Sequence, residues 1–350
     1  MFKKGLAMKK LGNVLYITTP EAYLSLEGET VVVKKEEKQS TRLPLHNLEA
    51  IVCFNYPGIS PALMGACAER NIGLSFLKPG GRFLARVTGR VKGNLLLRKK
   101  QYRLAQDETT AVSVAASCLS AKIFNSRQVI NRAIRDHALL VDGAALKTTA
   151  DSLKQTLVAV QTAANLETLR GLEGSAAKQY FGVFDQLILQ QKEAFAFTGR
   201  NRRPPRDKVN ALLSFLYTLL TYEMSSALET VGLDPQVGFL HVDRPGRPSL
   251  SLDLIEELRP VLADRLALTL INRQQIKGSG FACQESGGIL MDDDTRKTVL
   301  TAWQEKKQTP IVHPYLQERI PLGLLPHTQA LLLARYLRGD LDAYPPFFWK

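Results

Sequence analysis

The first part of the chain consists of short apolar runs separated by turn residues. These runs are rich in β-branched and aromatic residues, which is typical of strands, and turn sequences such as LEGET lie between them. One short helix is predicted where Ser60 can cap the helix and Pro61 takes its first position. We therefore expect a small β-rich domain over residues 1–92. The predicted strands lie within residues 13–19, 23–28, 30–37, 48–55 and 73–89.

The pattern changes near residue 95, where apolar positions begin to recur at intervals of three and four. This period predicts amphipathic helices, and the composition is dominated by residues that favour helices. We expect an all-α domain over residues 93–340, followed by a Pro- and aromatic-rich tail over residues 341–350. The expected fold class is therefore α+β. The predicted helical segments are 111–136, 150–189, 207–233 and 254–273.

The composition is that of an ordinary soluble protein. Hydrophobic residues make up 45% of the chain and charged residues 23%. The longest apolar run, residues 211–220, is too short to span a bilayer, and no signal peptide is recognisable after the basic N-terminus. The four cysteines lack zinc-finger spacing. We expect a cytoplasmic protein with no membrane association.

The charge distribution points to a polyanionic partner. The net charge is +13, and residues 1–108 hold 18 basic and 9 acidic side chains. The stretch from Arg82 to Arg103 contains eight basic residues and no acidic one. Such clustering favours nucleic acid, because each phosphate that is neutralised releases condensed counterions. The alternative is charge that serves only solubility.

Residues 250–260, LSLDLIEELRP, gather acidic side chains at the predicted start of a helix. Ser251 is a candidate N-cap, and Asp253 in the first turn would favour the helix dipole. Asp253 and Glu256 are three residues apart and therefore share one helix face. Two interpretations stay open at this point: ordinary helix-terminal charges, or half of a metal site.

Two residues elsewhere favour the metal site. His241 ends the apolar run VGFLH, although a lone histidine in such a place is more often structural. Glu173 lies among small residues in LRGLEGSAAKQYF, which predicts a crowded helix crossing where a buried carboxylate needs a partner or a cation. Glu173, His241 and Glu256, with Asp253 close by, form a candidate site whose donors suit Mg²⁺ or Mn²⁺. The residues thus predict metal-dependent phosphodiester chemistry on nucleic acid, with a non-catalytic nucleic-acid binder as the competing interpretation.

The whole chain resembles the CRISPR-associated adaptation integrases, the Cas-one family, and in particular its type I-C branch. The likeness is carried by three blocks in order: LRGLEGSAAKQYF, RNRRPPRDKVNALLSFLYTLL and DPQVGFLHVDRPGRPSLSLDLIEELRP. The resemblance implies a β-sandwich-like N-terminal domain for dimerisation and DNA binding. It also implies an α-helical catalytic domain and a working homodimer.

The resemblance further implies a metal-dependent DNA endonuclease and integrase. The metal ligands fall on Glu173, His241 and Glu256, and Asp253 matches a further acid that is a neighbour or an alternate ligand. Two dimers join a small partner, Cas-two, in a heterohexamer that holds a DNA duplex. A 3′-hydroxyl at each DNA end attacks a phosphodiester at the CRISPR repeat, and the same site nicks double-stranded or branched DNA. A related integrase of a mobile element is the other alternative.

We expect phosphate contacts from the basic stretches and from the loop that precedes the acidic helix. The alternative for the loop around Arg200 is a disordered surface insert. The expected DNA-binding residues are Arg82, Arg86, Lys99, Arg200, Arg202, Arg203, Arg206, Arg244 and Arg247.

Overall fold

The computed structural model describes residues 11–35, 39–54, 56–90, 95–202 and 204–349. The chain divides into two compact units. One comprises residues 1–91 together with 307–310 and 321–324, and the other comprises the remainder. The sequence predicted a domain boundary between residues 92 and 93, and the structure divides the chain between residues 91 and 92. The functional roles expected for the two domains stay predictions.

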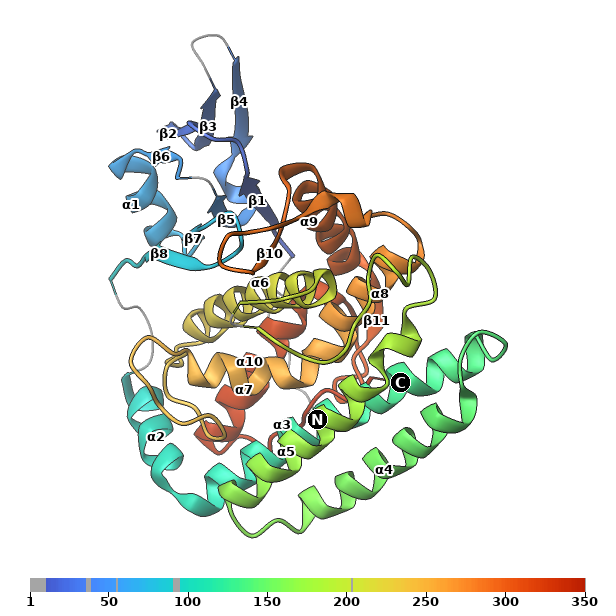
Figure 1. Ribbon diagram of the computed structural model, residues 1–350. Helices are drawn as coiled ribbons and strands as arrows, with labels where there is room; N and C mark the ends of the chain where they lie inside the picture. The colour runs from blue at the N-terminus through green and yellow to red at the C-terminus, as the bar shows by residue number, and fades with distance from the viewer. Residues whose placement is uncertain (1–10, 36–38, 55, 91–94, 203, 350) are drawn as a thin grey trace. The chain divides into compact units, whose positions relative to one another are not determined.

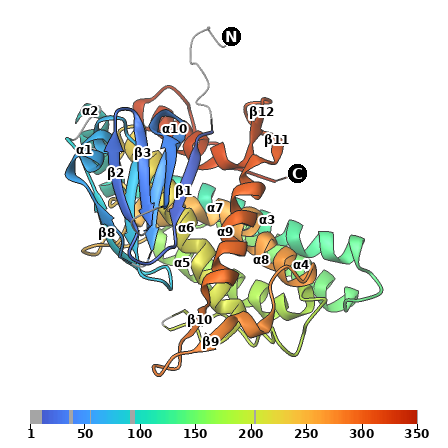
Figure 2. The ribbon, with the colours of Figure 1, turned by 90° about the horizontal axis from the view of Figure 1, so that it is seen from above.

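The N-terminal unit contains two four-stranded sheets, drawn mainly as blue arrows in Figure 2. In the first sheet, β1, β5 and β7 run parallel and β8 is antiparallel to β7. In the second, β3 pairs antiparallel with β2 and β4, and β6 is parallel to β2. The first sheet has the order β1 (Asn13–Ile17), β5 (Leu48–Phe54), β7 (Gly73–Leu77) and β8 (Phe83–Val87). The second has the order β4 (Gln39–Pro44), β3 (Thr30–Lys35), β2 (Tyr23–Glu27) and β6 (Gly58–Ile59).

One hydrophobic cluster is shared by both sheets and by the helix α1 (Pro61–Glu69). The predicted cap of α1 is confirmed, because Ser60 accepts a hydrogen bond from the Leu63 N–H at 3.3 Å and Pro61 occupies the first turn. The short 3₁₀ helix η1 (Leu45–Asn47) joins β4 to β5. The buried members of the cluster include Ile17, Leu24, Val31, Ile51, Leu63 and Leu74.

The second unit is mainly helical and is organised around the long helix α3, which packs against α4, α5 and α7 (Figure 1). Asp107 begins α3 by accepting a hydrogen bond from the Thr110 N–H at 2.9 Å. The helices before the candidate acidic helix are α2 (Leu95–Gln106), α3 (Glu108–Asp136), α4 (Gly143–Gln161), α5 (Leu166–Gly182), η2 (Phe184–Leu187) and α6 (Lys208–Thr230). The elements that follow η3 and α8 are η4 (Gly278–Gly280), β9 (Phe281–Cys283), β10 (Ile289–Met291), α9 (Asp293–Gln308), β11 (Pro310–Val312), β12 (Arg319–Pro321), η5 (Leu322–Leu324) and α10 (Leu325–Arg338).

The acidic helix is one part of a continuous helical rod. It starts as α7 (Ser249–Leu258), widens into the π-helix η3 (Arg259–Asp264) and continues as α8 (Arg265–Asn272). Pro260 lacks an N–H and cannot complete the regular α-helical ladder, which accounts for the widened turn. The widened turn carries the side chains of Arg259 and Asp264, which both line the largest pocket described below.

Two expectations about the helical region are wrong. The segment 150–189 is not one helix, because Asn165 caps a new helix by accepting a hydrogen bond from the Thr168 N–H at 2.8 Å. The region is also not all-α, since β9 pairs with β10 and β11 with β12. These strands have three residues each, too few for alternation to be recognised in the sequence.

The C-terminal tail is packed into the helical unit through the buried side chain of Glu257. One Glu257 oxygen accepts the Phe347 N–H at 2.6 Å, and the Tyr344 hydroxyl donates to the other. Asn125 of α3 holds the same segment, because it donates to the Phe347 carbonyl at 2.9 Å and accepts the Trp349 N–H at 2.8 Å. Burial raises the pKa of Glu257 to about 7 even though these hydrogen bonds favour the carboxylate.

No helix within the described residues is long and apolar enough to cross a membrane.

Replacing Glu257 with alanine should lower the free energy of unfolding by about 3 kcal/mol, because several buried donors lose their acceptor at once. Urea denaturation followed by helical circular dichroism measures the loss. Glu305→Ala, at an exposed carboxylate of α9, is the matched control and should change stability by less than about 0.5 kcal/mol. Equal stabilities of the two variants would contradict the proposed role of Glu257 in anchoring the tail.

Candidate metal centre

The acidic side chains of α7 are buried, so they are not solvent-exposed charges at a helix end. Asp253 and Glu257 are fully buried, and Glu256 is 1% exposed. The predicted cap is wrong as well, because the helix begins at Ser249 and Ser251 lies inside it. The Ser251 hydroxyl bonds that of Ser225 on α6 at 2.8 Å.

Asp253 holds the segment that carries His241. Its carboxylate accepts the backbone N–H groups of Phe239 at 2.6 Å, Leu240 at 3.0 Å and His241 at 3.0 Å. The His241 Nδ1 lies 2.6 Å from Asp253 Oδ1. A proton on Nδ1 that is shared with the carboxylate leaves Nε2 as the lone-pair nitrogen, the usual arrangement of a metal-binding histidine.

Gly238 lets this loop approach the helix closely. A Cβ atom at this position would lie 2.6 Å from Asp253 Oδ2 and 2.8 Å from the carbonyl carbon of Ser249. No larger residue fits without a shift of the backbone, and glycine has no Cβ. The close approach therefore brings the N–H groups within reach of the buried carboxylate.

Glu256 is surrounded by positive charge. Its Oε1 forms an ion pair with Arg259, and its Oε2 lies 2.7 Å from Lys122 Nζ of α3. Burial opposes the ionisation of Glu256, but Arg259, Lys122 and His241 outweigh it and lower its pKa to about 2. Glu256 is therefore a carboxylate at neutral pH and lies close enough to His241 to be influenced by it.

Glu173 joins the same cluster from α5. Its Oε1 forms an ion pair with the Lys122 ammonium, so one amine contacts both glutamates. The expected crowded helix crossing is wrong, because Gly171 and Gly174 face open space and the Glu173 side chain is 32% exposed. Glu173 thus approaches the buried Glu256 from the solvent side of the site.

The side chains of Glu173, His241 and Glu256 have donor atoms that suit a divalent cation, although in this structure they contact other protein groups. Among the described residues, no three His, Cys, Asp or Glu side chains are grouped closely enough to hold a metal ion. Lys122 stands between the two carboxylates, and Glu256 Oε2 is a buried atom without an aligned hydrogen bond despite its 2.7 Å approach to that amine. Movement of Lys122 would free the carboxylates of Glu173 and Glu256, which with His241 have donor atoms suited to Mg²⁺ or Mn²⁺.

The cluster opens into a pocket of about 630 Å³ in the helical unit. Glu173, Lys122 and Arg259 line it together with Tyr217, whose hydroxyl donates to Asp264 at 2.6 Å. Burial raises the pKa of Asp264 to about 6, although the hydroxyl groups of two tyrosines donate to it. Sequence patterns do not single out Lys122, Tyr217 or Asp264, because each lies within a helical stretch that looks like ordinary core.

The expected DNA-binding residues are divided between several places. Arg200 and Arg202 line the pocket, and Arg200 is fixed by Asn210 Oδ1 at 2.6 Å and by the Ser214 hydroxyl at 3.1 Å. The loop is therefore an ordered wall of the pocket in its described part, which contradicts a disordered insert. Arg203 lies outside the described residues.

The other expected contacts are not among the residues that line this pocket. Arg82 and Arg86 belong to the N-terminal unit, and Lys99 is exposed on α2 of the helical unit. Arg206 is exposed just before α6. The loop that joins His241 to α7 carries the exposed Arg244 and the half-buried Arg247.

Comparison with known proteins decides the family. A family model described as CRISPR associated protein Cas1 matches residues 15–305. The CRISPR-associated endonuclease Cas1 1 of Chlorobaculum tepidum is 50% identical over 343 residues, which cover 98% of this chain and 100% of the relative. The chain belongs to the Cas1 family. This membership confirms the expected CRISPR-associated endonuclease and integrase of spacer acquisition, while the type I-C branch stays a prediction.

Two solved structures share the fold. A casposase bound to integration product has a TM-score of 0.83 and 19% identity, covering 96% of this chain and 94% of that chain. A chain of a Cas6-RT-Cas1--Cas2 complex has a TM-score of 0.81 and 25% identity, covering 99% of this chain and 37% of that chain. The expected α+β class, with a β-rich N-terminal and a helical C-terminal region, is confirmed. The casposase shares only the fold, and the full-length relative favours Cas1 over a mobile-element integrase.

Changing Asp253 to asparagine should lower the free energy of unfolding by about 2 kcal/mol, because an amide cannot accept all four of these hydrogen bonds. Chemical denaturation of both proteins measures the difference. Asp243→Asn, at an exposed acid of the loop after His241, is the control and should be nearly neutral. A stability equal to that of the control would exclude Asp253 as the anchor of the His241 segment.

Proposed function

We propose that this Cas1 family member joins DNA by a metal-dependent attack of a 3′-hydroxyl on a phosphodiester, at a site formed by Glu173, His241 and Glu256. The observation that carries the proposal is the convergence of Glu173 and Glu256 on one amine, Lys122 Nζ. The Asp253 contact that orients the His241 ring supports it, as does the influence of His241 on the pKa of Glu256. Mg²⁺ or Mn²⁺ is the cofactor that we propose.

A divalent cation bound there would activate the attacking hydroxyl and neutralise charge that develops on the phosphodiester. The residues of the chain perform the other tasks. Glu173 and Glu256 supply oxygen ligands, and Asp253 keeps the His241 ring in one orientation. Arg200 and Arg202 on the pocket wall would hold the phosphate oxygens, for which arginine has a suitable planar geometry. The same arrangement would allow nicking with water as the nucleophile.

A DNA-binding scaffold without chemistry is the competing proposal, and the geometry counts against it. Burying a carboxylate costs several kcal/mol unless charged partners compensate. A binding surface would need exposed cations, not the buried Glu256 with its lowered pKa beside Arg259. A metal centre explains why both glutamates are directed at one point.

We further propose the partners and the setting. Double-stranded and branched DNA are the substrates, and the likeness to a chain of the Cas6-RT-Cas1--Cas2 complex supports Cas2 as a partner, in a heterohexamer with two homodimers. The N-terminal unit, with two sheets around one core, would be sandwich-like and would serve dimerisation and DNA binding. A cytoplasmic location fits this role. The proposed phosphate contacts stay those of Arg82, Arg86, Lys99, Arg200, Arg202, Arg203, Arg206, Arg244 and Arg247.

Alanine at Glu173, His241 or Glu256 should lower Mn²⁺-dependent strand transfer by about a thousandfold or more, because each removes a ligand from one functional unit. A labelled DNA duplex with a free 3′-hydroxyl and a target containing a CRISPR repeat, with Cas2 present, measures the rate. DNA binding in a gel shift should persist. The matched control is Glu167→Ala, at an exposed glutamate of the same helix α5 as Glu173. Full strand transfer in all three site variants would refute the assignment.

Lys122→Met should bind Mn²⁺ about tenfold more tightly than the unaltered protein, because the cation no longer displaces a lysine from the two glutamates. The paramagnetic resonance signal of free Mn²⁺ measures this affinity without reference to activity. Lys122→Arg, which keeps the charge, serves as the control and should not gain affinity. If Lys122→Met leaves Mn²⁺ affinity unchanged, the metal does not bind between Glu173 and Glu256.

A further inference from the structure

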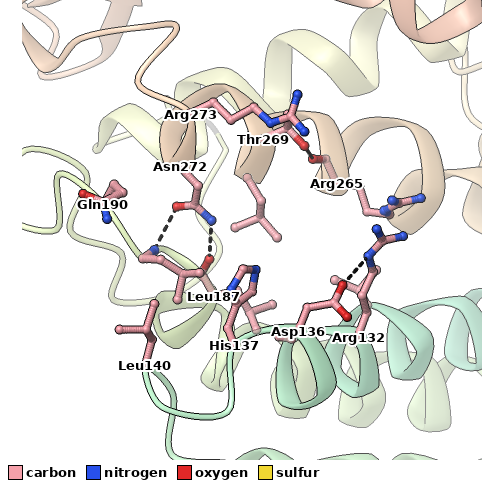
Figure 3. A pocket seen from close by; sticks show the side chains of 14 residues that line it. Arg132, Asp136, His137, Leu140, Leu187, Gln190, Arg265, Thr269, Asn272 and Arg273 are labelled. Carbon is pink, nitrogen blue, oxygen red and sulfur yellow. Dashed lines mark hydrogen bonds and ion pairs between the residues drawn. The ribbon is translucent and has the colours of Figure 1, made fainter.

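A second pocket of about 520 Å³ lies in the helical unit, and none of its residues belongs to the proposed metal centre. It is formed by the C-terminal end of α3, the segment after η2 and one face of α8 (Figure 3). Asn272 fixes the wall, because its side chain accepts the Leu189 N–H at 2.8 Å and donates to the Leu187 carbonyl at 2.9 Å.

Basic side chains gather around this pocket with little negative charge to balance them. Arg132 and Arg265 extend toward each other at one end, and Arg273, which directly follows α8, lies at the upper rim of Figure 3. Asp136 is the lining acid, and it is already paired with Arg132 at 3.0 Å and with Arg135 at 2.8 Å. No carboxylate of the described residues forms an ion pair with Arg265 or Arg273.

Like charges in this region lower the pKa values of two basic groups, Arg265 and Lys306. Burial, followed by the Arg132 charge, lowers the pKa of Arg265 to about 10. Lys306 of α9 does not line the pocket, but burial, Arg265 and Arg132 lower its pKa to about 8. Basic side chains that repel one another beside a pocket would be stabilised by a bound anion.

Arg265 is held ready for such an anion. Its guanidinium lies over the Trp349 ring at 3.9 Å from the centroid, which restrains the side chain on one side. Leu140, Leu187 and Leu268 provide an apolar part of the lining beside the cations. An apolar wall next to arginine donors suits a sugar or base that carries a phosphate, more than it suits a bare inorganic ion.

We propose that this pocket binds a phosphate group of a single DNA strand through Arg132, Arg265 and Arg273. The proposal rests on the DNA-joining function, because that function brings a strand to the same helix. Lys122 at the metal centre and Arg132 lie ten residues apart on α3, about 15 Å along its axis. That distance corresponds to a few nucleotides of an extended strand, so a strand could engage both places.

The test compares the strand affinities of the full-length protein and of the double variant Arg132→Gln with Arg273→Gln, which removes two charges that line the pocket. Fluorescence anisotropy with a labelled single-stranded oligothymidine, in a series of salt concentrations, measures binding. The double variant should bind about tenfold more weakly, and its dependence of affinity on salt should be shallower by about one to two units of slope. The Trp349 emission should change on addition of the strand and should change less in the variant.

The control removes two charges elsewhere on the same unit. Lys147→Gln with Lys154→Gln alters exposed lysines of α4. This variant should bind the strand within about twofold of the unaltered protein and should keep the same dependence of affinity on salt. Equal losses in both double variants would show a general charge effect and overturn the pocket. Equal binding of thymidine monophosphate and the strand would assign the pocket to a free nucleotide and overturn the DNA source.

Failure of this proposal is distinguishable from failure of the joining function. Strand transfer on blunt duplex ends tests the metal centre, and the Arg132 and Arg273 changes should leave that rate within about twofold. Suppose that strand transfer is lost only in the Glu173, His241 or Glu256 variants, and that the pocket variant binds oligothymidine as tightly as the unaltered protein. That result would refute the phosphate pocket and leave the metal centre standing.

Discussion

The burial of three carboxylates on α7, those of Asp253, Glu256 and Glu257, is the constraint on which the rest of the helical unit depends. An ionised carboxylate cannot be buried without compensation, because the loss of hydration exceeds what ordinary packing returns. Each acid therefore has a different partner set: backbone N–H groups and an imidazole for Asp253, two cations for Glu256, and the C-terminal tail for Glu257. These partners come from segments that are distant in sequence. Supplying partners to the buried acids of one short helix therefore fixes the positions of much of the helical unit.

The partner sets also separate structural from chemical tasks. Asp253 and Glu257 accept hydrogen bonds that hold a loop and the C-terminal tail. These bonds need not break for a metal ion to bind. Glu256 is different, since one of its oxygens contacts only a flexible lysine that it shares with the partly exposed Glu173. Asp253 and Glu257 thus position the helix and the histidine. The contact between Lys122 and Glu256, which a cation could replace, lies at the pocket where DNA chemistry would occur.

The sequence predicted most strands of the N-terminal unit and the capped helix after Ser60, because these depend on local patterns and capping, but it did not predict β4 or β6. It singled out the acids around Asp253, although the cap expected at Ser251 is wrong. It did not predict Lys122, whose glutamate partner lies 51 residues away, because helix packing alone brings them together. The same reason explains the failed expectation at Glu173, where small neighbours indicated crowding but face open space. Local signals also missed the break before Asn165 and the three-residue strands, which tertiary packing decides.

The account depends most directly on where a divalent cation binds. Crystals of the full chain soaked in Mn²⁺, with anomalous scattering recorded, locate the ion without any assay of activity. The account predicts one strong peak about 2.1 Å from oxygens of Glu173 and Glu256 and from His241 Nε2, with Lys122 Nζ displaced from its present contacts. A peak elsewhere, or a site that leaves Lys122 between the two glutamates, would contradict it.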